Sequence, residues 1–240
     1  EYSREFADFS PELMFGDGLY NYYYHFIKQN FPLLRPVLWL FPKANKLMGI
    51  QQLEKVSYQA FYTRTEARYF LLQIYGMENM SDKAYDLAKY THANFPDNPF
   101  FHRYLARSAF MTGKLDQAME LSKDILLKIG QHQIGYEATS GRYASYILGY
   151  YYLYVFKNPV DAKKYFNDCL SFSKQTDSMD SGYYWASVLG LARIAFQESN
   201  YDQAVDYCKE VLDKADRKSS QHTEAKKLLA EAKKARRKRK

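Results

Sequence analysis

The residues best suited to catalysis or metal binding are few and scattered. The five histidines form no HExxH motif and no pair four residues apart that could hold a metal ion. They are His25, His92, His102, His132 and His222. Gly16-Asp17-Gly18 lies in an aromatic helical run and lacks the lysine that follows a phosphate-binding loop. Because no nucleophile elbow or dinucleotide fingerprint occurs either, we predict a protein that is not an enzyme, with no metal and no cofactor.

The two cysteines, Cys169 and Cys208, have no CxxC or metal-ligand spacing. Both fall where the helical pattern described below requires a packed residue. We therefore expect buried, inert thiols in preference to reactive ones.

The composition favours long helices. Eleven Gly and seven Pro in 240 residues are too few for a turn-rich β protein, whereas 24 Tyr raise the aromatic share to 18%. The most apolar stretch, SYILGYYYLYVFKN at 145–158, stops well short of the roughly 18 residues that a membrane helix needs. We expect a soluble chain with no transmembrane segment.

The net charge of +7 comes from the last eight residues, KKARRKRK, which hold seven basic groups. Without them the basic residues equal the 27 acidic ones, and the rest of the chain is neutral. Any affinity for a polyanion or nucleic acid therefore belongs to the tail, residues 233–240. The alternative is a solvated helix end whose cations suit the helix dipole.

A repeated pattern runs along the chain: an apolar residue and a small one, an aromatic, a turn, then a helix with a small residue in its first turn. The clearest copy is VLGLARIAFQESNYDQAVDYCKEVL at 188–212, and the stretch at 145–158 begins another. The small residues of the second helices lie 35, 34, 44 and 42 residues apart, at Gly49, Ala84, Ala118, Ala162 and Ala204. The longer intervals require insertions of about ten residues, which fit in 128–141 and 171–182.

With its small residues at helix crossings and aromatics such as Phe110, Tyr152 and Phe196, the chain resembles the tetratricopeptide-repeat (TPR) family over nearly its whole length. The family's early Trp and closing Pro are mostly absent. The resemblance implies an all-α fold, a right-handed α-solenoid of about five TPR-like helix pairs in one domain, 1–240. The expected pairs are roughly 10–58, 62–96, 98–128, 140–173 and 182–215, followed by a capping helix at 221–238 and the basic tail.

Helix starts agree with this register. Ser10, Asn98 and Asn158 each precede a proline, which indicates an N-cap followed by Pro at the first helical position. Ser81 can cap a helix without proline.

Three segments, SPELMFGDGLYNYYYHF, FYTRTEARYFLLQIY and FPDNPFFHRYLAR, are similar to those of bacterial, Bacteroidetes-type TPR proteins, which typically carry export signals. The first is also similar to the opening of eukaryotic TPR relatives that act in inclusion-body clearance. The resemblance implies a scaffold or partner-binding role and an exported or periplasmic location, with the cytoplasm as the alternative. Because the chain opens at EYSREFADF without Met, we expect an N-terminal portion with further repeats to precede it.

In such a fold the first helices line a concave groove. Arg103 and Arg107 are four residues apart and share one helix face, and guanidinium groups suit carboxylates. Tyrosine rings nearby add flat contact area. The groove residues predicted from the register are Tyr69, Gln73, Arg103, Arg107, Tyr146, Tyr150, Tyr154 and Arg193.

We therefore expect a non-catalytic scaffold that binds a peptide or partner protein, through an extended segment or a C-terminal carboxylate. The competing interpretation is that the arginines pair with Asp or Glu of adjacent helices. The family's carboxylate clamp uses Lys and Asn at several of these positions, which this sequence lacks, so a chaperone tail is not the expected ligand. The alternative function is a polyanion or nucleic-acid adaptor acting through the tail.

The segment NFPLLRPVLWLFPK, at 30–43, combines three prolines with a run of apolar residues, so it cannot form one regular helix. We expect it to pack over the first repeat. The alternative is an exposed docking patch at Leu38, Trp39 and Phe41 for a protein partner or a membrane surface.

Overall fold

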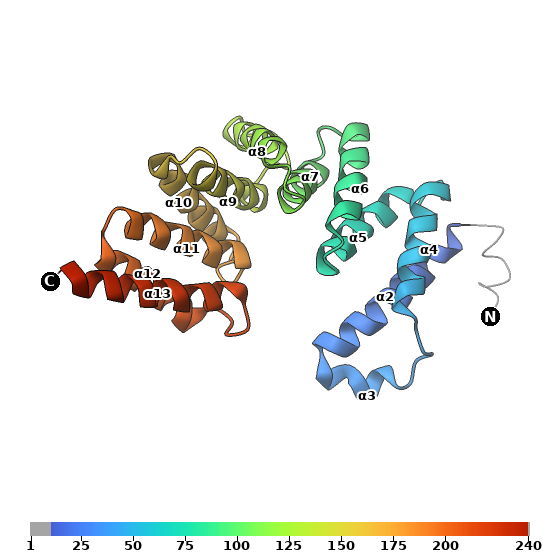
Figure 1. Ribbon diagram of the computed structural model, residues 1–240. Coiled ribbons are helices and arrows are strands. Elements are labelled where there is room, and N and C mark those ends of the chain that lie inside the picture. The colour runs from blue at the N-terminus through green and yellow to red at the C-terminus, as the bar shows by residue number, and fades with distance from the viewer. Residues whose placement is uncertain (1–10, 240) are drawn as a thin grey trace. The chain divides into compact units, whose positions relative to one another are not determined.

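The protein is described by a computed structural model of residues 11–239, in which every regular element is a helix (Figure 1). The all-α class is therefore confirmed. The chain divides into two compact units, residues 1–91 and 92–240. Whether they form one repeat domain stays a prediction. The helices of the first unit are α2 (Leu13–Asn30), the short η1 (Pro32–Leu34) and α3 (Arg35–Leu38), α4 (Lys46–Gln59), α5 (Arg64–Met77) and α6 (Ser81–Asn94), which contains the boundary.

In the first unit α2 packs against α4, and α4 packs against α5. Gly18 and Gly49 lie at the crossing of α2 and α4. A Cβ atom on Gly49 would lie 2.7 Å from the backbone nitrogen of Tyr22 and 2.8 Å from the backbone oxygen of Gly18. Backbone atoms cannot move aside as a side chain can, so the close approach of these two helices requires glycine.

Glu12 precedes α2 but caps a different helix. Its carboxylate accepts hydrogen bonds from the backbone N–H groups of Phe61, Tyr62 and Thr63, at 2.5, 2.9 and 3.0 Å, just before α5 begins. The Thr63 hydroxyl donates another at 2.6 Å. This last bond, with the backbone bonds, lowers the pKa of Glu12 to about 2. Ser10, which was predicted to cap the first helix, lies outside the described residues.

The proline-containing segment between α2 and α4 does not pack over the first repeat, so that expectation is wrong. Leu33, Trp39 and Leu40 are 92, 85 and 76% exposed. Phe41 is also exposed, and Leu38 is half-buried. The prolines limit the segment to the two short helical pieces η1 and α3, which are too small to cover a core.

The second unit contains α7 (Pro99–Met111), α8 (Leu115–Gly130), α9 (Ala138–Tyr154), α10 (Pro159–Gln175), α11 (Gly182–Gln197), α12 (Tyr201–Lys214) and α13 (Ser220–Arg239). Each helix packs against the next one in sequence. In addition, α7 contacts α9, α9 contacts α11, and α11 contacts α13 (Figure 1). The alternate helices α7, α9, α11 and α13 therefore line up side by side.

Phe166 of α10 fills the space between two first helices. Its ring is fully buried against Gly149 of α9 and Gly190 of α11, and a Cβ atom on either glycine would overlap it. Ala118, Ala162 and Ala204 are also completely buried. The prediction that small residues sit at helix crossings and receive an aromatic is confirmed at Gly149 and Gly190.

The predicted caps at Asn98 and Asn158 are confirmed. The Asn98 side chain accepts from the N–H groups of Phe100 and Phe101, and Asn158 does the same for α10. The long repeat intervals come from longer helices as well as loops. Helices α8 to α11 have 16 or 17 residues, against 13 or 14 for α5, α6 and α7.

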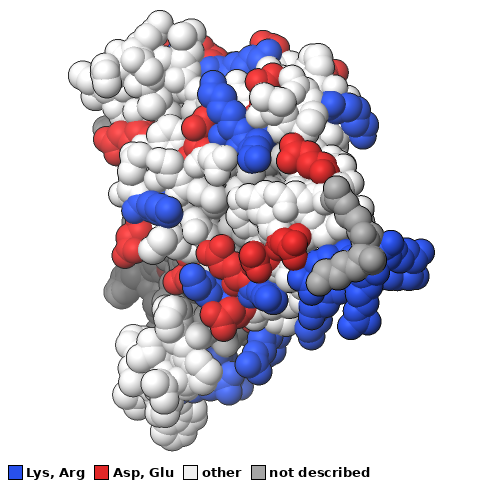
Figure 2. Space-filling model, turned by 90° about the vertical axis from the view of Figure 1, so that its left-hand side faces the viewer, with Lys and Arg blue, Asp and Glu red and all other residues white. Residues whose placement is uncertain are grey.

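The last helix, α13, extends one residue further at each end than the capping helix expected at 221–238. It buries Ala225, Leu228 and Ala232 against α11 and α12, as a capping helix should, and continues through Arg239, so most of the basic tail is helical. Arg236 pairs with Asp202 of α12 at 2.9 Å. Figure 2 shows a dense group of Lys and Arg side chains on the face where this helix ends. Within residues 11–239, no helix is both long and apolar enough to cross a membrane.

Candidate functional site

Two adjoining cavities form a groove along the first helices of the second unit. The larger, about 340 Å³, lies between α9, α11 and α13. The smaller, about 220 Å³, shares Tyr146, Ala186 and Gln221 with it and extends to α7. We call the two together the aromatic groove. Its main side chains are Phe110, Tyr146, Tyr150, Tyr154, Tyr183, Arg193 and Glu224.

The three predicted tyrosines of α9 lie together in this groove because they are four residues apart and share one helix face. The Tyr150 ring is 4.6 Å from that of Tyr154 and 4.9 Å from that of Phe110 on α7. Burial raises the pKa of Tyr146 well above its ordinary value, so this phenol stays neutral. The groove wall is thus aromatic and uncharged along α9.

Arg193 does not offer a free guanidinium group. It forms an ion pair with Glu224 of α13, through hydrogen bonds of 2.9 Å from Nε and 2.5 Å from Nη2 to one carboxylate oxygen. Both side chains are about 40% exposed at the cavity wall. For Arg193, therefore, pairing with a carboxylate of a neighbouring helix is the correct interpretation.

Arg107 has a different environment. Its guanidinium group lies 5.8 Å from the ring centre of Tyr104 and 6.0 Å from that of Tyr143. Burial alone lowers the pKa of Arg107. The nearby Tyr183, Tyr143 and Tyr104 outweigh burial, and the hydrogen bond with Tyr183 adds to their effect, so that the pKa is raised above its ordinary value. Among residues 11–239, no carboxylate forms an ion pair with Arg107.

Two further arginines lie around the ring of Tyr143. Arg103 donates to the Ser140 hydroxyl at 3.1 Å, and its guanidinium group is 5.7 Å from the Tyr143 ring. Arg142, 8% exposed, lies 5.1 Å from that ring, and its Nε has no hydrogen-bond partner in the described part of the chain. Arg103, Arg107 and Arg142 form what we call the arginine cluster. Arg142 was not among the predicted site residues, since a buried position on α9 is expected to be apolar.

The remaining predicted groove residues, Tyr69 and Gln73, are on α5 in the first unit. Tyr69 is 40% exposed, and its ring meets that of Phe70 edge-on at 5.3 Å. Gln73 is half-buried. Their part in binding stays a prediction.

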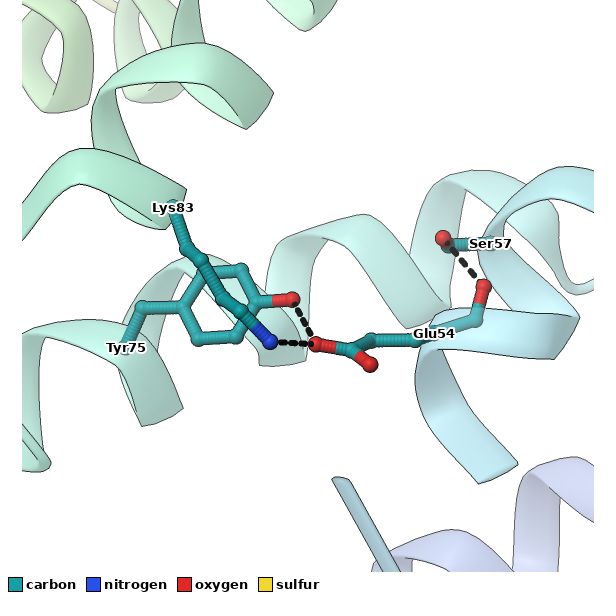
Figure 3. A network of polar contacts seen from close by, with 4 residues as sticks. All are labelled: Glu54, Ser57, Tyr75 and Lys83. Carbon is teal, nitrogen blue, oxygen red and sulfur yellow. Dashed lines mark hydrogen bonds and ion pairs between the residues drawn. The ribbon is translucent and has the colours of Figure 1, made fainter. Parts of the chain in front are cut away.

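The first unit has a cavity of about 300 Å³ in which four of the polar side chains form one hydrogen-bonded network. Glu54 of α4 accepts hydrogen bonds from the Tyr75 hydroxyl on α5 and from Lys83 on α6, both at 2.7 Å (Figure 3). The Ser57 hydroxyl donates to the backbone oxygen of Glu54 at 2.7 Å. These bonds tie three helices together, so the network is structural.

Cys169 and Cys208 are both completely buried, and burial raises the pKa of each thiol to about 11. Since the thiolate is the reactive form, we expect neither cysteine to react with iodoacetamide at pH 8 while the protein is folded. Mass spectrometry after labelling in buffer and in urea checks this, with both thiols labelled in urea as the positive control. Rapid labelling of either thiol in buffer would contradict it.

No group of three or more His, Cys, Asp or Glu side chains within residues 11–239 is arranged to hold a metal ion. No protein-family model matches the chain, and no curated protein matches it in sequence. The resemblance to TPR proteins therefore depends on the repeated residues quoted above.

Proposed function

We propose that the chain is a non-catalytic protein-interaction module, a TPR-like right-handed solenoid of about five helix pairs whose aromatic groove binds an extended peptide segment of a partner protein. Support for the repeat comes from the pairwise packing of consecutive helices and from the buried alanines at each crossing of the second unit. Preformed helices suit this role because the cost of ordering falls on the peptide alone.

The observation that carries the proposal is the environment of Arg107. A partly buried guanidinium group surrounded by tyrosines, to which no carboxylate of residues 11–239 is paired, is suited to receive an acidic group from outside. The nearby Arg103 adds a second positive charge and is already oriented by Ser140. The peptide would place a side-chain or C-terminal carboxylate at the arginine cluster and lay flat groups along the tyrosines of α9.

The test is a selection from random peptides displayed with free and with amidated C-termini. We expect the selected peptides to carry a carboxylate, and Arg107→Met to weaken their binding by about thirtyfold or more, since removing one partner of a buried charged pair costs about 2 kcal/mol or more. Tyr150→Ala should weaken the binding of the same peptides. Arg217, exposed before α13, provides the matched control as Arg217→Met. Peptides that bind Arg107→Met as tightly as the original protein would contradict the proposal.

The second candidate is a polyanion adaptor acting through the tail. It is favoured by the dense basic group at the end of α13, where Lys233, Lys234, Arg237 and Lys238 are exposed (Figure 2). This function predicts that binding to heparin or single-stranded nucleic acid falls steeply with added salt and is lost when these four residues are changed to Gln. Peptide binding in the groove should survive that change.

A further inference from the structure

The turn between α2 and α4 exposes an unusual concentration of large apolar side chains. Figure 1 shows α3 at the end of the α2–α4 hairpin. Within the segment 31–41 seven such residues are exposed, and we call this set the apolar tip. Its members are Phe31, Leu33, Leu34, Val37, Trp39, Leu40 and Phe41.

The apolar tip is held in one conformation by polar side chains of α2. The Tyr20 hydroxyl donates to the backbone oxygen of Pro42 at 2.6 Å, and the Tyr24 hydroxyl donates to that of Leu38 at 3.3 Å. His25 Nε2 lies 2.8 Å from the backbone oxygen of Ala44. These bonds hold the backbone of the segment while its apolar side chains are exposed to solvent, and an exposed apolar patch of this kind marks an interaction site.

The charged residues that neighbour the apolar tip in the sequence have one sign. Between Asp17 and Glu54 the sequence contains no acidic residue. Lys28, Arg35 and Lys43 flank the tip, and all three are exposed. An exposed segment that combines apolar side chains with cations is complementary to an apolar layer covered by negative charge.

We propose that the apolar tip inserts into the surface of an anionic phospholipid bilayer. Trp39 and the phenylalanines would lie at the depth of the headgroups and the leucines below them, while the three cations contact the phosphates. A protein partner would need a pocket shaped around a protruding turn, whereas a fluid bilayer accepts one of any shape. Binding of this kind leaves the aromatic groove of the second unit unused.

The test uses vesicles of phosphatidylcholine alone and of phosphatidylcholine mixed with phosphatidylserine. The chain has two tryptophans, Trp39 in the tip and the buried Trp185, so Trp185→Phe leaves Trp39 as the only reporter. We expect the Trp39 emission to shift to the blue, and its quenching by acrylamide to fall, with the mixed vesicles. Trp39→Ser/Leu40→Ser in the otherwise unchanged chain should reduce co-sedimentation by at least about tenfold. Lys28→Gln/Lys43→Gln should reduce it by about fivefold per charge.

Controls separate this surface from others. Ile134→Ser/Val160→Ser removes two exposed apolar side chains of the second unit and should leave vesicle binding unchanged. Lys233→Gln/Lys234→Gln/Lys238→Gln should reduce it far less than Trp39→Ser/Leu40→Ser does. The proposal is overturned if neither vesicle binds the chain, or if binding survives Trp39→Ser/Leu40→Ser and is lost with the tail variant. It is equally overturned if light scattering shows a dimer that Trp39→Ser/Leu40→Ser converts to a monomer, since the apolar tip would then be a contact between two copies.

Discussion

Replacing Phe166 with Ala should lower the free energy of unfolding of the second unit by about 3–5 kcal/mol. The ring is fully buried between Gly149 of α9 and Gly190 of α11. Without the ring, these two helices could close the space between them only by moving relative to one another. The loss therefore combines the removed apolar surface with a cavity that stays open. Urea unfolding followed by Trp185 fluorescence, in a Trp39→Phe background, reports the second unit specifically.

Phe156, on the loop after α9 and 60% exposed, is the matched control, and Phe156→Ala should cost far less. A double-mutant cycle sharpens the test. Gly190→Ala alone should destabilise by crowding the ring, but should cost less in a chain that already carries Phe166→Ala, because the new methyl group then occupies part of the cavity. Strict additivity of the two substitutions would show that Phe166 does not fill the space between the helices.

Lowering the pH from 6.5 to about 4 should destabilise the second unit by about 3 kcal/mol through His102. This side chain is 1% exposed, shares a 3.1 Å hydrogen bond with the Tyr136 hydroxyl, and stacks on His92 at 4.7 Å. Burial first, then the positive charges of His92 and Lys128, lower the pKa of His102 to about 4. The carboxylate of Asp124, 3.8 Å away, opposes this only in part, because it also pairs with Lys128.

The sign follows from proton binding. Between pH 6.5 and about 4 the unfolded chain binds a proton at this histidine and the folded chain does not, so stability is greatest above pH 6.5 and falls as the pH drops.

Urea midpoints for Trp185 fluorescence at pH 7 and 4.5 measure the loss. His102→Gln should lower stability at pH 7 but flatten its pH dependence. His132→Asn, at an exposed position with a φ of 56° that Asn tolerates, should leave the pH dependence unchanged. Equal pH dependence in His102→Gln and the original chain would contradict the assignment.

The helices could be predicted from the sequence because their signals are local. Asn98-Pro99 and Asn158-Pro159 mark helix starts, and the buried Ala118, Ala162 and Ala204 recur at the crossings. The tyrosines of α9 share one face for the same reason. These features depend on the 3.6-residue period, which a single sequence displays directly.

What could not be predicted depends on contacts between residues far apart in sequence. Arg142 is at a position predicted to be in the core, and its grouping with Arg103 and Arg107 around Tyr143 emerges only when α7 and α9 are brought together. The pairing of Arg193 with Glu224 was one of two open interpretations until α11 and α13 were seen to pack. Exposure of the apolar tip was the alternative interpretation and not the expected one, because a run of Leu, Trp and Phe predicts burial wherever geometry permits it.

The contact of Glu12 with α5 also bears on synthesis of the chain. The Glu12 carboxylate that caps α5 lies about fifty residues upstream of the N–H groups whose hydrogen bonds it accepts, so Glu12 leaves the ribosome before they do. The helix that it caps can therefore be stabilised as soon as its first turn emerges, without waiting for downstream sequence. Folding of the first unit can in this way keep pace with translation, each new helix joining a part of the chain that is already outside the exit tunnel.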